Sequence, residues 1–372
     1  MSSENHQTRI LLSSGGTGGH VFPALALADD LLSRGFAVHL ATDKRGEAYI
    51  GKGFHKFDYT VLSSGTLRAG LKGKVAGLLA MGRGYWNARQ LVKNWKPHVV
   101  VGFGGYPSVP AVLAAQRNDI PTILHEQNAI VGKANLYLAP RAERIALSLP
   151  GGKGLDETDM VRSIVTGNPV RPEVAALYTK PYPALQRDGE MNILVFGGSQ
   201  GASVFSETLP LALAALPDIY KSRIRIVQQC RTEEELAATK DFYLKAHIPA
   251  ECALFFDNMP ERLAKAHLVI SRSGASTVAE VTTAGRPAIF VPYPHHADQQ
   301  QMRNAEAVAE EGGAWVMPEN GFTAEALRTR LETFMQHPEI LFKAAEASRS
   351  SAKPDAARKL GNLVTAIALG WN

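Results

Sequence analysis

The sequence predicts an α/β protein built from two doubly wound, Rossmann-like domains. Short apolar stretches alternate with helical stretches along most of the 372 residues, as successive βαβ units require. The pattern also restarts midway, because segment 192–216 repeats the layout of segment 9–35: an apolar strand, two glycines, a hydroxyl residue, a further glycine and a helix. A chain of this length, 45% hydrophobic, can bury two sizeable cores.

In the first half, we expect a strand at 9–13, a helix at 23–33 and a strand at 37–42, and the apolar segments 97–103, 109–117, 121–127 and 144–149 continue the alternation. In the second half it continues through 192–216, 222–230, 253–285 and 287–294. The expected domains are 1–165 and 191–345, with a proline-rich connector at 166–190. The last helix could pack on either domain, and we expect segment 350–372 to join the first.

Composition excludes several classes of protein. The two cysteines, Cys230 and Cys252, predict neither a disulfide framework nor a zinc site, and they favour a reducing, cytosolic compartment. The polar N-terminus lacks an apolar signal core, and no run of about 18 apolar residues predicts a membrane span. The formal net charge of +5 is a weak indication of anionic partners, and nothing predicts nucleic-acid binding.

The distribution of charge is more informative. Residues 59–118 contain no Asp or Glu, and within region 68–96 basic side chains alternate with apolar and aromatic ones. A basic helix with an apolar, aromatic face suits an anionic membrane surface. The alternative is an ordinary amphipathic helix with a solvated basic face. The basic residues of 59–118 are Arg68, Lys72, Lys74, Arg83, Arg89, Lys93, Lys96 and Arg117.

Three glycine-containing turns, at 15–20, 197–202 and 271–277, each lie between a predicted strand and a predicted helix. Such turns bind phosphate, because glycine lets a ligand approach the backbone N–H groups at the positive end of the helix dipole. Thr17 and Ser199 occupy equivalent places in the first two. No Walker A sequence and no Asp-x-Asp pair occurs. We therefore expect diphosphate charge to be met by helix N-termini and basic side chains, without a metal.

A dinucleotide-binding loop is the main alternative. Gly16 and Gly18 begin the GxGxxG fingerprint, but Val21 stands where its third glycine belongs, and the loop 197–202 does not complete it either. Asp43 ends the next strand and could bind a ribose. That possibility keeps the alternative open.

Polar residues near these turns are candidates for chemistry. At the start of a helix, whose dipole disfavours the protonated form, a neutral His20 could act as a general base for a hydroxyl; the alternative is a capping or phosphate-binding role. Segment 125–128 places polar side chains at the carboxyl end of a strand, where doubly wound sheets bind ligands. Glu280, within a predicted helix, could accept two hydrogen bonds from a ribose diol, or it could be a solvated helix residue.

Seven stretches together, in order over about residues 9–320, resemble the MurG family of bacterial peptidoglycan glycosyltransferases. They are GGTGGHVFPALALA, GFGGYPSVP, LHEQNAIVGKAN, GNPVRPEV, FGGSQGA, SRSGASTVAE and PYPHHADQQQMRNA. The resemblance implies the GT-B architecture, two Rossmann-like domains separated by a cleft, and no metal or other cofactor. It implies inverting transfer of N-acetylglucosamine from UDP-N-acetylglucosamine to the C4 hydroxyl of the muramyl sugar of lipid I, giving lipid II. It also implies a peripheral enzyme on the cytoplasmic face of the bacterial inner membrane.

The resemblance also implies roles for residues of the first domain, the acceptor and membrane side. His20 would be the catalytic base or an acceptor contact, Asn128 would line the acceptor site, and Arg171 would lie near the donor diphosphate. The residues of the first phosphate loop would be Thr17, Gly18 and Gly19.

In the second domain, the resemblance implies a donor site. Ser199 would bind the α-phosphate, Phe256 would contact uracil, and Gln300 and Gln301 would contact N-acetylglucosamine. The glutamine run 299–301 leaves its register open by one residue, and Ser276 replaces a larger apolar residue of many relatives. The residues implied to hold sugar, phosphate and ribose, the last by Glu280, are Ala275, Ser276, Thr277, Val278, Ala279 and Glu280.

Three functions are therefore compared. The first is the metal-independent glycosyltransferase. The second is an NAD(P)-linked oxidoreductase that uses one glycine loop, which the missing third glycine and the tandem layout disfavour. The third is a non-catalytic nucleotide-sugar or membrane-surface binding protein of the same fold. Only an activity measurement separates the third from the first.

Overall fold

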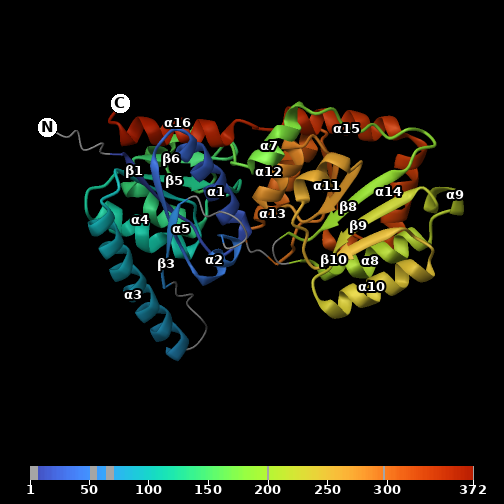
Figure 1. Ribbon diagram of the computed structural model, residues 1–372. Helices are drawn as coiled ribbons and strands as arrows, with labels where there is room; N and C mark the ends of the chain where they lie inside the picture. The colour runs from blue at the N-terminus through green and yellow to red at the C-terminus, as the bar shows by residue number, and fades with distance from the viewer. Residues whose placement is uncertain (1–6, 51–56, 64–70, 199–200, 296–297, 372) are drawn as a thin grey trace. The chain divides into compact units, whose positions relative to one another are not determined.

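The computed structural model describes residues 7–50, 57–63, 71–198, 201–295 and 298–371, and of residues 71–79 only the backbone. The chain divides into two compact units, which we call unit 1 (Met1–Arg171 with Asp355–Asn372) and unit 2 (Pro172–Pro354). Figure 1 labels their helices and strands. The proline-rich segment 166–190 divides between the units, with residues 172–190 in unit 2.

Unit 1 contains a parallel sheet with seven strands among the described residues, in the order β3-β2-β1-β4-β5-β6-β7. Alternate residues of β1 enter two different cores: Leu11 packs in one cluster, and Ile10 and Leu12 pack in the other. Both faces of the sheet are therefore covered, which explains the continuous apolar runs of its central strands. The strands are β1 Arg9–Ser13, β2 Ala37–Thr42, β3 Asp58–Val61, β4 Val99–Gly102, β5 Thr122–Glu126, β6 Arg144–Leu147 and β7 Ser163–Val165.

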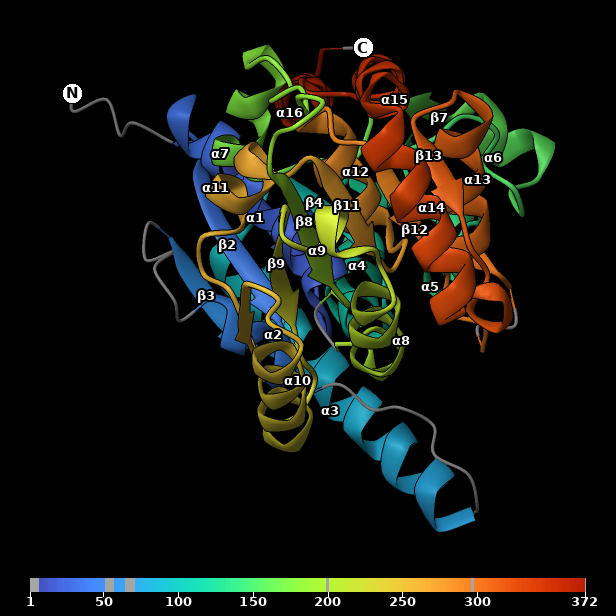
Figure 2. The ribbon, with the colours of Figure 1, turned by 90° about the vertical axis from the view of Figure 1, so that its right-hand side faces the viewer.

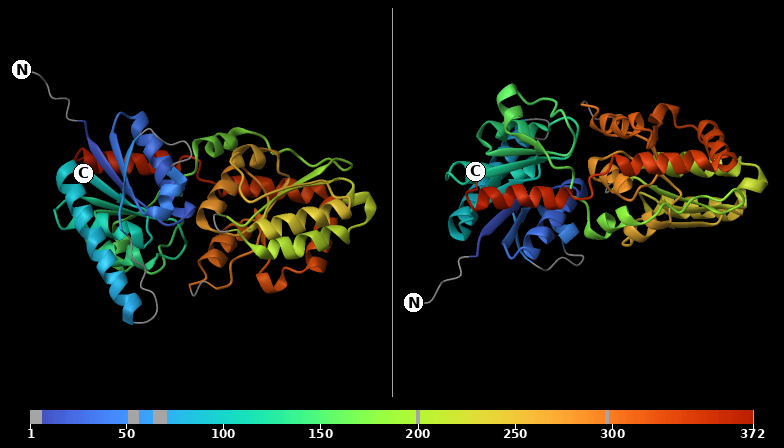
Figure 3. Two further views of the ribbon diagram at one scale, coloured as in Figure 1. Left: turned by 60° about the horizontal axis from the view of Figure 1, so that its bottom comes forward. Right: turned by 90° about the horizontal axis from the view of Figure 1, so that it is seen from above.

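The C-terminal helix α16 (Ala356–Ala368) packs beside α1 (Gly18–Ser33) in unit 1, as the right-hand view of Figure 3 shows. Leu360 and Val364 of α16 are fully buried in the same core as Leu12. The other helices of unit 1 are α2 Lys44–Ile50, α3 Leu71–Trp95, η1 Tyr106–Ser108, α4 Val109–Gln116, α5 Lys133–Leu138, η2 Ala139–Arg141 and α6 Glu157–Val161.

Helix α1 begins five residues before the start predicted at Pro23. The glycines of the first loop, Gly18 and Gly19, form its first turn, and Pro23 lies inside the helix. The helix starts directly at the loop, so its N-terminal N–H groups are the loop's own backbone groups. The prediction of the helix start was wrong because a proline was taken as the boundary.

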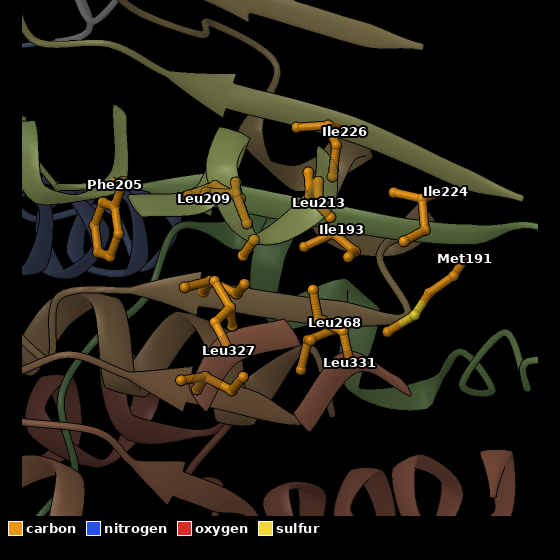
Figure 4. Close-up of a cluster of buried hydrophobic side chains, with 14 of the residues drawn as sticks. Met191, Ile193, Phe205, Leu209, Leu213, Ile224, Ile226, Leu268, Leu327 and Leu331 are labelled. Carbon is orange, nitrogen blue, oxygen red and sulfur yellow. The ribbon is translucent and has the colours of Figure 1, made fainter. Parts of the chain in front are cut away.

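Unit 2 contains a six-stranded parallel sheet among the described residues, in the order β10-β9-β8-β11-β12-β13. Its core, drawn in Figure 4, packs Ile193 and Ile226 of the sheet against Phe205, Leu209 and Leu213 of one helix. The strands are β8 Met191–Phe196, β9 Ile224–Gln229, β10 Ala250–Ala253, β11 Leu268–Ser271, β12 Ala288–Phe290 and β13 Ala314–Val316. The helices are α7 Pro172–Ala175, η3 Ala176–Thr179, α8 Ser203–Ala214, α9 Asp218–Lys221, α10 Glu233–Lys245, α11 Met259–Lys265, α12 Ala275–Thr283, α13 Gln300–Glu310, η4 Glu319–Gly321, α14 Ala324–Gln336 and α15 Pro338–Ser350.

The predicted fold class is confirmed, because each unit is a parallel sheet of doubly wound order. In each, the strand order reverses beside the first strand, between β1 and β4 in unit 1 and between β8 and β11 in unit 2. Ligands of doubly wound sheets bind at the carboxyl ends of the strands at this switch point. Both glycine loops, after β1 and after β8, start there.

Helix α3 extends away from the sheet of unit 1 in Figure 2 and packs on α4 near its own C-terminal end. No described helix combines the length and the hydropathy that crossing a bilayer requires.

Candidate functional site

The loop after β1 leads straight into α1 with a bare backbone. Thr17 is the N-cap of α1 in an extended conformation and makes no side-chain capping bond. Gly16 has a φ of +83°, which favours glycine. Gly18 and Gly19 form the first helical turn, so the three predicted loop residues lie together at the helix N-terminus. This geometry suits an anionic ligand.

Asp43, at the end of β2, braces that loop. Its Oδ1 accepts hydrogen bonds from the N–H groups of Gly16 and Gly46, both at 2.9 Å, and its Oδ2 forms an ion pair with Arg45 at 3.0 Å. Burial opposes ionisation, but the N–H groups of Gly46 and Gly16 and the Arg45 guanidinium hold the pKa of Asp43 below its ordinary value. The carboxylate proposed to bind a ribose is thus already used within the protein, which disfavours the dinucleotide alternative.

His20 lies in the first turn of α1 and contacts a buried polar chain. Its Nδ1 is 3.0 Å from Oε1 of Gln127. The amide nitrogen of Gln127 lies 2.9 Å from the carbonyl oxygen of Phe103 and 3.0 Å from Nδ1 of His125. His125 in turn places Nε2 3.1 Å from the carbonyl oxygen of Gly167. A chain of hydrogen bonds therefore connects the candidate base to the carboxyl ends of three strands, β4, β5 and β7.

Two glycines after β4, Gly104 and Gly105, pack against the side chains of this polar chain. A Cβ on Gly105 would lie 3.3 Å from Cδ2 of His20 and 3.5 Å from its Nε2, and a Cβ on Gly104 would lie 3.7 Å from Oε1 of Gln127. Both glycines have positive φ, +74° for Gly104 and +73° for Gly105. The loop backbone therefore packs directly beside the imidazole.

Glu126 organises the neighbouring loop around Asn128. Its Oε1 accepts hydrogen bonds from the backbone N–H of Asn128 at 3.0 Å and from the Asn128 side chain at 3.2 Å. Its Oε2 accepts from Gly132 and Asn135 at 2.9 and 2.8 Å. Glu126 is 2% exposed, so its four hydrogen bonds satisfy a buried carboxylate. Asn128, predicted to line the acceptor site, is thus held in one orientation.

In unit 2, the loop after β8 meets the first turn of α12. A Cβ on Gly198 would lie 4.0 Å from Oγ1 of Thr277, and Gly198 has a φ of +78°. Ala275, Ser276 and Thr277 form the first turn of α12, and Gly274 is its N-cap without a side-chain bond. Two of the predicted phosphate-binding turns therefore adjoin at the switch point. Ser199 lies outside the described residues.

Glu280 and its neighbours continue α12. Val278 and Glu280 are buried on this helix, at 8% and 9% exposure, and Ala279 is half-buried between them. A helix carboxylate that is nearly buried at the edge of a ligand site is poorly explained as a solvated surface residue. The ribose role of Glu280 stays a prediction.

The two predicted glutamines differ in their surroundings. Gln300 begins α13 after Gln299, whose φ is +51°. Gln301 places Oε1 3.0 Å from the backbone N–H of Tyr293, and its carbonyl oxygen accepts from Ser273 at 2.7 Å. Gln301 therefore links the loop after β12 to the turn before α12. Gln300 contacts Asp298 instead, with its backbone N–H donating to Oδ1 at 3.4 Å.

Phe256 is 6% exposed, and the guanidinium of Arg262 covers its ring at 4.0 Å from the centroid. Arg262 is held there by two hydrogen bonds to Glu251 at 2.6 and 2.8 Å. A contact from Phe256 to a base would therefore use its backbone, not its ring face. The neighbouring Phe255 is 47% exposed.

Arg171 is the last residue of the first stretch of unit 1, and its guanidinium lies 5.2 Å from the ring centroid of Phe22 on α1. Its predicted role at a diphosphate stays a prediction. Within the described residues, no group of three or more His, Cys, Asp or Glu side chains is arranged to hold a metal ion.

Sequence reasoning missed the supporting residues of the site. It placed His125, Glu126 and Gln127 at a strand end but assigned them no role, and it considered Asp43 only as a ribose ligand under the dinucleotide alternative. His125 and Glu126 lie inside β5, not after it. The signal available was the run of four polar residues, 125–128, at the end of an apolar strand, a position where buried polar groups need partners.

Two doubly wound units with glycine loops at both switch points define the GT-B class of nucleotide-sugar enzymes. The glycosyltransferase family 28 N-terminal domain matches residues 10–147, and the family's C-terminal domain matches residues 192–360. A UDP-N-acetylglucosamine–N-acetylmuramyl-(pentapeptide) pyrophosphoryl-undecaprenol N-acetylglucosamine transferase of Rhodospirillum centenum is 51% identical over 96% of this chain and 94% of its own. The Brucella canis protein of the same name is 46% identical over 100% and 97%.

A solved structure of similar fold supports the same family assignment. MurG of Acinetobacter baumannii superimposes with a TM-score of 0.75 and 29% identity over 96% of this chain and 99% of its own. The glycotransferase of kitacinnamycin, at 18% identity and a TM-score of 0.70 over 98% and 100% of the two chains, supports the fold alone. The chain belongs to the family of these N-acetylglucosamine transferases, within glycosyltransferase family 28.

Proposed function

We propose that the protein transfers N-acetylglucosamine from UDP-N-acetylglucosamine to the C4 hydroxyl of the muramyl sugar of lipid I, giving lipid II. The observation that carries this proposal is the similarity to relatives of that name, which extends over nearly the whole of both chains. Unit 1 takes the acceptor, and unit 2 takes the donor.

The reaction is a single displacement at the anomeric carbon that inverts the configuration there. It needs a base for the acceptor hydroxyl and stabilisation of the departing diphosphate. His20 is the base, a role supported by its place at the glycine loop and by the hydrogen bond that orients its ring. Asn128, held by Glu126, contacts the acceptor.

The donor binds where the loop 197–202 adjoins α12. Ser199 and the first turn of α12 bind phosphate, Glu280 binds the ribose hydroxyls, and the backbone of Phe256 contacts uracil. Gln300 and Gln301 contact the sugar. The adjoining of Gly198 and Thr277 supports this division of roles, because it brings two backbone anion sites together.

The transfer is independent of metal. The N-termini of α8 and α12 in unit 2, together with basic side chains, meet the charge of the diphosphate, which is the role that a divalent cation has in other sugar-nucleotide enzymes.

The protein is a peripheral enzyme of the cytoplasmic face of the inner membrane. The described part of region 68–96 supports this through exposed Arg83 and Lys93 on α3 and through Trp86, which is 56% exposed. Basic side chains attract anionic headgroups, and tryptophan favours the membrane interface.

Sugar transfer from labelled UDP-N-acetylglucosamine to a short-chain lipid I analogue, in excess EDTA, tests the proposal. We expect a labelled disaccharide-lipid together with released UDP. Donor binding without transfer would indicate a binding protein or a different acceptor. Transfer that stops in EDTA and returns with Mg²⁺ would contradict metal independence alone.

A further inference from the structure

The candidate base His20 is one end of a chain of hydrogen bonds whose purpose the proposed reaction leaves open. The chain runs from Nδ1 of His20 to Oε1 of Gln127, from Nε2 of Gln127 to Nδ1 of His125, and from Nε2 of His125 to the carbonyl oxygen of Gly167. Gln127 is 2% exposed and His125 is 0% exposed. Bulk water therefore does not compete for the contacts between Gln127, His125 and Gly167.

The far end of the chain determines which atoms carry hydrogen. The carbonyl oxygen of Gly167 can only accept, so Nε2 of His125 is the donor. Burial, opposed by the bond to Gly167 and assisted by the nearby His20, lowers the pKa of His125 to about 4. The ring is therefore neutral at pH 7, and its Nδ1 accepts a hydrogen bond from Gln127.

The amide of Gln127 has only one satisfactory orientation. Its Nε2 donates both to His125 and to the carbonyl oxygen of Phe103, at 3.0 and 2.9 Å. A flipped amide would set its oxygen against two acceptors in a buried place, which costs free energy. Oε1 is therefore the atom that faces His20, and it can only accept. Nδ1 of His20 must donate this hydrogen bond, so it carries a hydrogen.

A neutral histidine that carries its hydrogen on Nδ1 has its lone pair on Nε2. We propose that Gln127 and His125 are positioning residues that fix His20 in this tautomer, so that Nε2 is the atom that receives the proton of the acceptor hydroxyl. This inference rests on the proposed function. Gly105 packs beside this edge of the ring, where a Cβ would lie 3.3 Å from Cδ2 and 3.5 Å from Nε2.

The partner of His20 is a neutral amide, and this separates two effects that a carboxylate partner would combine. A carboxylate orients an imidazole and also stabilises its protonated form by charge. The amide of Gln127 supplies orientation alone. Its own orientation depends on two fixed acceptors, the Phe103 carbonyl and the His125 ring.

Gln127→Met tests the chain, because methionine has nearly the same shape and neither donates nor strongly accepts hydrogen bonds. We expect kcat to fall roughly 10- to 100-fold while the KM for UDP-N-acetylglucosamine stays within about twofold. In protein labelled with ring-¹⁵N histidine, the His20 resonances, assigned by their loss in His20→Gln, should change from the Nδ1-protonated pattern to a mixture of tautomers. Gln127→Glu keeps an acceptor for His20 but sets its second oxygen against the Phe103 carbonyl and Nδ1 of His125, so it should not restore kcat.

Gln116→Met is the matched control. Gln116 is a partly buried amide of the same unit that donates to Oγ1 of Thr122 and to the carbonyl oxygen of Leu138, without contact to His20. It should lower the thermal stability and leave kcat and the His20 pattern unchanged.

Two outcomes overturn the inference. In the first, Gln127→Met keeps both the kcat and the His20 tautomer of the wild type. In the second, Gln127→Met loses kcat while the His20 pattern is unchanged, which would give Gln127 a structural role only. The spectroscopic measurement needs no substrate. A wild-type protein that shows the Nδ1-protonated His20 and its change in Gln127→Met, but transfers no sugar, would therefore overturn the proposed function and support the positioning role.

Discussion

Oδ1 of Asp43 accepts a hydrogen bond from the backbone N–H of Gly16 at 2.9 Å, so the end of β2 holds the glycine loop that follows β1. Two neighbouring strands thereby fix one loop. The same carboxylate also accepts from Gly46 and pairs with Arg45.

Asp43→Ala should therefore loosen the loop of unit 1 specifically. We expect the KM for the lipid I analogue to rise and kcat to fall, with donor affinity unchanged, and the free energy of unfolding to drop by about 1–3 kcal/mol because buried N–H groups lose their partner. Steady-state kinetics and urea unfolding measure these changes. Glu143→Ala, an exposed carboxylate of the same unit, should change none of them. A selective loss of donor affinity would contradict the assignment.

His20→Ala should cut kcat by roughly 10²- to 10⁴-fold, the usual contribution of a general base, while donor affinity changes little. Transfer kinetics and equilibrium titration with UDP-N-acetylglucosamine measure the two quantities separately. A variant with near-normal turnover would exclude His20 as the base.

Glu280→Ala should weaken donor binding by roughly 10- to 100-fold, because two hydrogen bonds from a ribose diol to a charged group would be lost. Isothermal titration with UDP measures the effect without the acceptor. Glu310→Ala, at the exposed end of α13, is the control and should bind UDP normally. Normal affinity in Glu280→Ala would argue against the ribose contact.

Charge reversal at Arg83 and Lys93 should weaken binding to vesicles that contain anionic lipid. Each neutralised cation is worth about 1 kcal/mol near such a surface, so Arg83→Glu with Lys93→Glu should lower the partition coefficient by more than tenfold. Co-sedimentation at two salt concentrations measures it. Lys240→Glu, exposed on α10 of unit 2, is the control. If the double variant bound the vesicles as well as the wild type, α3 would be an ordinary amphipathic helix with a solvated basic face.

The buried His125 should make unit 1 less stable in acid. Burial lowers its folded-state pKa from 6.5 to about 4, so above pH 6.5 the full stability is present. Between these two values the unfolded chain binds a proton that the folded protein does not, and stability is lost as the pH falls. The full loss in the free energy of unfolding is about 3 kcal/mol, because each pKa unit between the folded and unfolded values is worth about 1.4 kcal/mol.

Urea unfolding from pH 7.5 to 4 checks this. His125→Gln, though less stable at pH 7.5, should lose less on acidification than the wild type, whereas the exposed His295→Gln should follow the wild type. An unchanged pH dependence in His125→Gln would mean that other groups cause the loss.

The fold was predictable from sequence where both faces of a strand are buried. Strands such as β1 and β4 are continuous apolar runs, and the glycine turns mark the switch points. The edge strands β3 and β7 were not predicted, because they are three or four residues long and mostly exposed, so no apolar pattern marks them. The start of α1 was misplaced because the helix begins with two glycines, the weakest helix formers after proline, and Pro23 was taken as its boundary.

For the site, the motifs identified the loops but not the contacts between them. The family resemblance is confirmed by the relatives, and Thr17, His20 and Glu280 stay predictions as functional residues. The hydrogen bonds between Gly16 and Asp43 and between His20 and Gln127 form only because strands distant in sequence end at the same edge of a sheet. No local pattern encodes such pairings.

Helix α16 has a consequence for biosynthesis. Its buried Leu360 and Val364 belong to the core of unit 1, yet they are synthesised after the whole of unit 2. Unit 2 is one uninterrupted stretch, Pro172–Pro354, so it can complete its core before α16 is made. Unit 1 cannot, although its first 171 residues are made earlier. The core that α1 shares with α16 is therefore completed only after unit 2 has been synthesised.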